Sequence, residues 1–191
     1  MKTTTRIIST AIATSILTTP ALAHTGVGHT HGLFAGLAHP IAGVDHLLAM
    51  LAVGIWSALV MRQRRVWAAP AAFVLAMLAG AALGVAGVAL PQVEAGIALS
   101  VVALGLMILT RVEMPVAAGA VLAALFALYH GHAHGSEATG AVAAYMAGFA
   151  ATTATLHIVG IGLGWLLARA SYAPRIVGAA IAAFGAYAMA G

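Results

Sequence analysis

Residues 33–65 of this 191-residue chain read LFAGLAHPIAGVDHLLAMLAVGIWSALVMRQRR. The stretch is apolar over a length sufficient to cross a bilayer, contains one short polar segment, and ends at a cluster of arginines. A basic cluster directly after a long apolar run is typical of a helix that leaves the membrane at the cytoplasmic surface. The stretch therefore predicts an α-helical membrane protein whose first span carries polar side chains.

The composition of the whole chain supports a membrane location. Hydrophobic residues make up 63% of the chain and charged residues 6%, and the mean hydropathy is +1.06. An ordinary soluble domain is about 25% charged, so this composition argues strongly against a soluble globular enzyme. The sequence pI near 10.1 does not indicate a nucleic-acid partner, because the arginines lie singly or in one short cluster beside apolar runs.

The side chains available for chemistry are mainly imidazoles. The chain has nine histidines and no cysteine, so disulfides and thiolate ligands are excluded. Lys2 is the sole lysine, which removes a Walker A motif from any mature form that lacks the N-terminus. ATP-driven pumping by this chain alone is therefore not expected.

Residues 1–23 have the features of a signal peptide. Lys2 and Arg6 precede an apolar stretch over residues 7–17, and Ala21-Leu22-Ala23 is a small-residue cleavage site. Cleavage after Ala23 would leave residues 24–191 as a single transmembrane domain with a periplasmic, His-rich N-terminus. The alternative is an uncleaved additional helix, which the short apolar core disfavours.

Six apolar runs between turn signals predict an all-α, polytopic membrane helix bundle. The runs cover about residues 33–61, 66–90, 93–110, 114–130, 140–168 and 174–190. Two pairs of glycines at i, i+4 spacing predict faces that allow close helix packing: Gly80 with Gly84, and Gly160 with Gly164.

The positive charges of the mature chain orient the six spans. After residue 23 they fall only in alternate connections, at Arg62, Arg64, Arg65, Arg111, Arg169 and Arg175. Because Lys and Arg are retained in the cytoplasm, the mature N-terminus is expected in the periplasm of a bacterium, with the spans in the inner membrane. Three spans on each side of the middle loop also place the two halves in inverted orientation, a feature common in secondary transporters.

The first span combines histidines, an acid and helix-breaking residues. His39, Gly43, His46 and Met50 lie on one helical stripe. A straight helix would separate the Cα atoms of His39 and His46 by about 10.5 Å, so we expect Pro40 and Gly43 to kink the helix and bring the side chains together.

Asp45 is a functional candidate because a carboxylate within a span costs about 2.5–3.5 kcal/mol. The alternative is that Asp45 caps a broken helix or only pairs with His46.

Further histidines form three other groups. His130, His134 and Glu137 share one face if that segment is helical, although Gly131 and Gly135 suggest a frayed backbone and a solvated His-rich loop is the alternative. His157 lies inside the fifth span, where a lone histidine often only donates to a neighbouring helix.

His24, His29 and His31 precede the first span. After cleavage, the α-amine and imidazole of His24 could chelate one ion with help from His29 or His31, which intact-mass analysis of the purified protein would test.

Depth along the helices places these groups in a column. At about 1.5 Å per residue, His39 lies near the outer surface and His157 about 18 Å above Arg169, with His46 and His134 between them. Such a ladder suits a divalent cation that is handed from site to site. Imidazole with carboxylate suits Ni²⁺, Co²⁺, Zn²⁺ or Cu²⁺ and argues against Mg²⁺ and Ca²⁺, and ligand type alone does not separate the first four ions.

Three segments resemble one family in the same order along the chain. HPIAGVDHLLAM at residues 39–50, YHGHAHGSE at 129–137 and TLHIVG at 155–160 are similar to the HupE/UreJ family of nickel and cobalt permeases. The resemblance implies secondary uptake of Ni²⁺, or Co²⁺ in some members, with no prosthetic group and with hydrogenase, urease or cobalamin assembly as the destination of the metal. It assigns metal translocation to His39, Asp45 and His46, and extends this role to His130, His134, Glu137 and His157; it does not cover His132.

Two other functions stay open from the residues themselves. One is an intramembrane zinc hydrolase with three histidines and Asp45 around the metal, although HExxH is absent. The other is a metal-binding accessory protein without transport.

Overall fold

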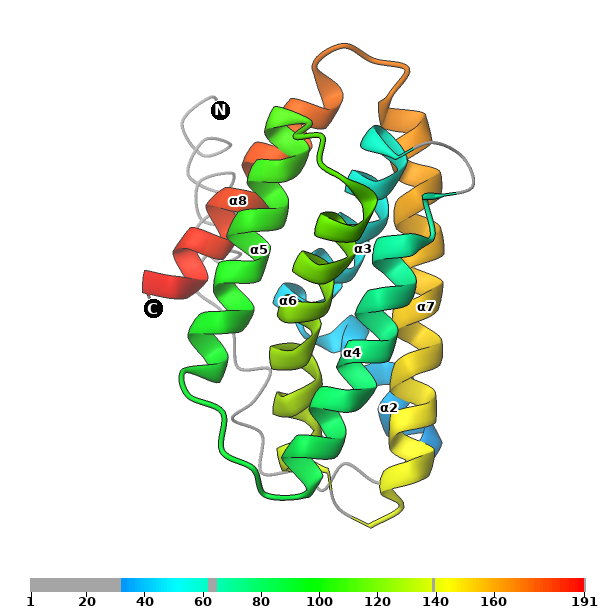
Figure 1. The fold of residues 1–191 in the computed structure, drawn as a ribbon, viewed down its shortest axis with the longest axis vertical. Coiled ribbons are helices and arrows are strands. Elements are labelled where there is room, and N and C mark those ends of the chain that lie inside the picture. Colours follow the sequence, from blue (N-terminus) through cyan, green and yellow to red (C-terminus); the bar gives the residue numbers. More distant parts are fainter. Residues whose placement is uncertain (1–31, 62–64, 139, 191) are drawn as a thin grey trace, which may run out of the picture.

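The computed structural model describes residues 32–61, 65–138 and 140–190, and within these ranges the chain is all-helical. The helices form an elongated bundle, with α5 and α8 on one side and α7 on the other (Figure 1). Their bounds are α2 Gly32–Ala42, α3 Val44–Val60, α4 Ala68–Val85, α5 Val93–Thr110, α6 Val116–Glu137, α7 Val142–Leu167 and α8 Ala173–Ala190. The expected signal peptide and the candidate ligands His24, His29 and His31 lie outside the described residues.

The predicted spans correspond to these helices. Helices α4 to α8 are each long and apolar enough to cross a membrane, and the α2–α3 pair counts as a sixth candidate if the two bent helices form one span. The range 66–90 predicted for the second span was too long. Helix α4 ends at Val85, and Gly87, two residues later, adopts a φ of 72°. Glycine tolerates this left-handed conformation and commonly ends helices in this way.

The first span is broken at the predicted place. Helices α2 and α3 meet at an angle of 79°, and Gly43 between them has an extended backbone with φ −91° and ψ 116°. Pro40 lacks an N–H group, and the amide of Gly43 makes a long 3.3 Å hydrogen bond to the His39 carbonyl. The weakened hydrogen-bond ladder explains why the helix turns here rather than at another point.

Glycines determine how closely the helices approach. A Cβ at Gly131 or Gly135 of α6 would collide with the backbone of Met77 or Ala81 of α4. The sequence prediction of a frayed backbone was therefore wrong: α6 continues as a helix to Glu137, and these glycines are packing positions.

The two predicted small-residue faces are confirmed. Gly80 and Gly84 pack against the backbone of α6, and Gly160 and Gly164 pack against α3. Since lipid provides little hydrophobic drive for helix association, such close backbone contact is a major source of attraction between spans.

The helix pairing relates the two halves of the chain. The first half of the chain contains α2 to α5, and the second half contains α6 to α8. The α2–α3 pair packs on α7, α4 packs on α6, and α5 packs on α8. The first span of each half thus packs on the second span of the other half, and the third spans pack on each other. This pattern agrees with two inverted halves.

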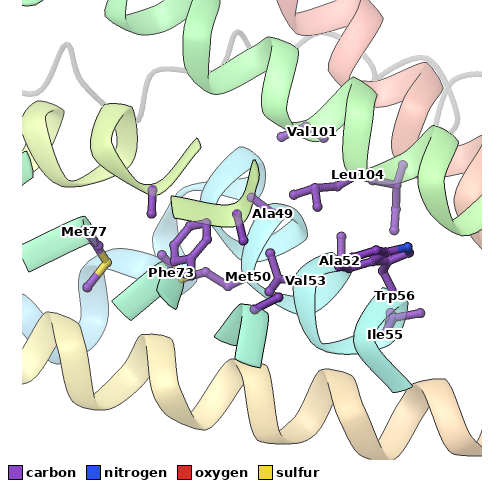
Figure 2. Close-up of a cluster of buried hydrophobic side chains, with 14 of the residues drawn as sticks. Ala49, Met50, Ala52, Val53, Ile55, Trp56, Phe73, Met77, Val101 and Leu104 are labelled. Atoms are coloured by element: carbon purple, nitrogen blue, oxygen red, sulfur yellow. The ribbon is translucent and has the colours of Figure 1, made fainter. Parts of the chain in front are cut away.

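The core is built around α3, and side chains of α4 to α8 complete it. Figure 2 shows Met50, Trp56, Phe73 and Leu104 among its buried side chains, and all four are nearly inaccessible. The indole N–H of Trp56 donates to the Val112 carbonyl at 3.0 Å, so it ties α3 to the connection between α5 and α6. The polar site lies beside this core.

Candidate metal site

Four histidine rings from three helices form one cluster. The ring centroids of His39 and His134 are 4.4 Å apart, those of His134 and His46 are 4.6 Å apart, and those of His46 and His130 are 4.7 Å apart. His46, His130 and His134 are completely buried, and His39 is half-buried. The structure therefore brings together four residues that the sequence placed in two separate motifs.

The broken helix is what brings His39 to this cluster. Its ring centroid lies 6.3 Å from that of His46, and both rings contact His134 on α6. In a straight helix the two Cα atoms would be about 10.5 Å apart along the axis. The turn at Gly43 instead lets residues of α2 and α3 face a common point.

Asp45 acts on its neighbour His46. One carboxylate oxygen, Oδ1, accepts hydrogen bonds from the backbone N–H of His46 at 2.8 Å and from its ring Nδ1 at 2.9 Å. A carboxylate can only accept, so Nδ1 carries the proton and Nε2 carries the lone pair. This is the carboxylate–histidine arrangement that orients metal ligands in many sites, and it corresponds to the pairing alternative considered for Asp45.

Ser100 of α5 orients the ring of His130, as Asp45 orients that of His46. The sequence analysis did not identify Ser100 as a site residue. Its hydroxyl donates to the Ile97 carbonyl at 2.6 Å, so it must accept from Nε2 of His130 at 2.9 Å. The lone pair of His130 is consequently on Nδ1. The available signal was a serine inside an apolar span, but such a serine commonly bonds only to its own helix.

Aromatic side chains of α7 and α4 line the cluster, and they were also missed. Phe149 lies 4.1 Å from His134 between ring centroids, and Tyr145 lies 6.0 Å from His39. Phe73 contacts His130 at 5.6 Å. In sequence these aromatics could not be told from ordinary core residues, because only the tertiary fold brings them beside histidines.

His157 lies apart from the four-histidine cluster. Its Nδ1 donates to the Met50 carbonyl at 2.7 Å, and its ring contacts Phe73 at 5.1 Å. His157 therefore donates to a neighbouring helix, as the sequence analysis allowed for a lone histidine within a span. Phe73 is the aromatic ring that His157 and His130 share.

The remaining residues of the His-rich segment are placed differently. Glu137 is exposed at the last residue of α6, and His132 bonds through Nε2 to the Val88 carbonyl at 2.7 Å. Among the described residues, no three His, Asp or Glu side chains are arranged to hold one metal ion.

A multi-pass bundle with imidazoles buried at a helix break defines a polytopic membrane protein with a polar intramembrane site. The family model described as HupE / UreJ protein matches residues 12–188, and the chain belongs to this family. It is 44% identical over 188 residues to Protein HupE of Rhizobium leguminosarum bv. viciae, covering 94% of this chain and 95% of that protein. No solved structure matches the chain.

Proposed function

We propose that this protein is a secondary permease that takes up divalent transition-metal ions, with Ni²⁺ as the main cargo and Co²⁺ as the second. The observation that carries the proposal is the cluster of His39, His46, His130 and His134 within an apolar bundle, in which all but the half-buried His39 are completely buried. Buried polar side chains are expensive in a membrane and mark ion pathways. Membership of the HupE/UreJ family supports the same function.

The ligand chemistry supports transport over tight binding. Imidazole suits Ni²⁺ and Co²⁺, and the lone pairs of His46 and His130 are set by the carboxylate of Asp45 and the hydroxyl of Ser100. Because the described residues contain no ready three-ligand group, we propose that the ion passes between neighbouring imidazoles and is held weakly at each. A site that holds its ion too firmly would slow conduction.

The membrane potential can drive this uptake without nucleotide. A divalent ion that crosses a 100 mV inside-negative potential gains about 4.6 kcal/mol. We propose that the protein lies in the bacterial inner membrane with its mature N-terminus in the periplasm, because the arginines lie in alternate connections. The metal would then supply hydrogenase or urease maturation in the cytoplasm, and the protein itself needs no prosthetic group.

The test is Ni²⁺ uptake into liposomes that contain the full chain or its Asp45→Asn variant. Loss of the charge weakens both hydrogen bonds to His46, and losing such an orienting partner lowers metal affinity or activity by about 10–100-fold. The matched control is Glu94→Gln, the same acid-to-amide change at an exposed residue in the first turn of α5.

Three outcomes decide the proposal. Uptake by the wild type and by the control, with a large loss in Asp45→Asn, is the expected result. Absence of flux in the wild type would refute the permease, and undiminished flux in Asp45→Asn would refute the site. Competition among Ni²⁺, Co²⁺, Zn²⁺ and Cu²⁺ in the same assay ranks the ions. Metal-dependent hydrolysis without flux would instead favour the zinc hydrolase.

A further inference from the structure

Two methionines from different helices meet at one hydroxyl beside the histidine cluster. The hydroxyl oxygen of Thr153 on α7 lies 3.3 Å from the sulfur of Met50 on α3 and 3.6 Å from the sulfur of Met77 on α4. Both methionines are completely buried, and Figure 2 shows them in the same buried cluster as Phe73. Since one hydroxyl has a single proton to donate, Thr153 can satisfy one sulfur at a time.

His157 adds a buried imidazole to the same region of α7 and α3. It lies one turn beyond Thr153 on α7, and its Nδ1 donates to the backbone carbonyl of Met50. The proton is therefore on Nδ1 and the lone pair on Nε2. Nε2 of His157 is buried and has no hydrogen-bond partner among the described residues, and the residue is only 1% exposed.

Ordinary core packing does not account for all of these groups. Methionine often fills irregular gaps in a core, and that would explain Met50 or Met77 alone. A buried nitrogen lone pair without a partner is rare in proteins and calls for a ligand, an ion or a water. The two thioether sulfurs meet at Thr153, one turn from His157, and the ring of His157 bonds to the backbone of Met50, so a cation is the fitting ligand for these groups.

We propose that Met50, Met77 and His157 form a site for a soft monovalent cation of the Cu⁺ and Ag⁺ class. Thioethers select Cu⁺, whereas the imidazole cluster beside them suits harder divalent ions. The three ligands are uncharged, so a single positive charge is easier to accommodate in this buried place than a double one. Methionine is flexible, and small rotations of its side chain can bring both sulfurs to one ion.

The proposed site is separate from the histidine cluster and goes beyond nickel uptake. Phe73 contacts His130 of the cluster at 5.6 Å and His157 at 5.1 Å, so an aromatic ring lies against both groups. The same bundle would then distinguish two classes of cation by ligand softness. The thioether site would bind a soft ion, which nitrogen ligands alone do not distinguish well from harder ions.

The test is titration of the full chain in lipid nanodiscs with Ag⁺, with the methionine methyl groups labelled with carbon-13. One equivalent of Ag⁺ should shift the methyl resonances of Met50 and Met77 and leave that of Met107 unchanged. Met50→Leu, Met77→Leu and His157→Gln should each weaken Ag⁺ binding by about tenfold or more, because each removes one ligand. Met107→Leu on α5 is the matched control for the methionine variants.

Each other outcome overturns the proposal. Wild-type Ag⁺ affinity in the Met50→Leu/Met77→Leu double variant would mean that imidazoles hold the ion, and equal shifts of all methionines would mean non-specific binding. Leucine is a close match in volume to methionine, and thermal unfolding of each variant establishes that it is folded. Because the assay measures Ag⁺ binding and not Ni²⁺ flux, its failure leaves the proposed nickel uptake unaffected.

Discussion

Replacing Ser100 by alanine should impair the histidine cluster, although Ser100 belongs to none of the three sequence motifs. Its hydroxyl accepts the Nε2–H of His130 at 2.9 Å and donates to the Ile97 carbonyl at 2.6 Å. Both Ser100 and His130 are completely buried, so water does not replace the lost hydroxyl. In the variant the ring of His130 loses both its fixed orientation and the partner that keeps its lone pair on Nδ1.

The expected magnitude follows from these bonds. A buried donor left without an acceptor costs about 1–3 kcal/mol of folding free energy. Loss of a hydrogen bond that orients a metal ligand lowers affinity or activity by about 10–100-fold. We therefore expect Ser100→Ala to destabilise the protein and to reduce Ni²⁺ uptake in liposomes by about 10–100-fold.

Ser57→Ala is the matched control. Ser57 is also completely buried, but its hydroxyl oxygen has no hydrogen-bond partner among the described residues. Removing that oxygen should leave stability unchanged or raise it, since nothing is left unpaired. Thermal unfolding in nanodiscs, nitrogen-15 spectra of the histidine tautomers and uptake assays are compared for both variants. Equal behaviour of the two variants would refute the role assigned to Ser100.

Two further predictions, one on helix packing and one on a hydrogen bond, are measured by thermal unfolding in nanodiscs. Gly135→Ala should destabilise the bundle by about 1–3 kcal/mol, because the added Cβ would collide with the backbone carbonyl of Ala81. Gly162→Ala on α7 should be neutral, since a Cβ there meets no described atom within 4 Å; equal losses at both glycines would contradict the packing argument. Trp56→Phe should cost about 0.5–1.5 kcal/mol through loss of its bond to the Val112 carbonyl, and an unchanged midpoint would show that this bond contributes nothing.

Much of the fold could be predicted from the sequence because membrane spans are local features. The range 93–110 predicted for the third span coincides with α5, and the break expected at Pro40 and Gly43 is present. Both predictions rest on interactions within one helix, namely backbone hydrogen bonds and the solvation of consecutive side chains. Such interactions can be inferred from neighbouring residues alone.

The failed prediction at the end of α6 depended on contacts between helices, whereas the early end of α4 follows from a local glycine. Gly131 and Gly135 suggested a frayed end of α6, yet they are positions where α4 approaches closely. Glycine indicates flexibility in an isolated helix but permits close packing when another backbone covers it. The identity of that backbone is not written in the local sequence.

The sequence by itself determined that this chain is a helical membrane protein, where its first span breaks, and which imidazoles are available as ligands. Only the tertiary structure decided that four of those imidazoles meet, that Ser100 orients His130, and that Met50 and Met77 share the hydroxyl of Thr153. The physical reason is the separation along the chain of the residues that interact. Hydropathy and helix breaking act between neighbours along the chain, whereas a ligand set is made by side chains that close helix packing brings together from distant segments.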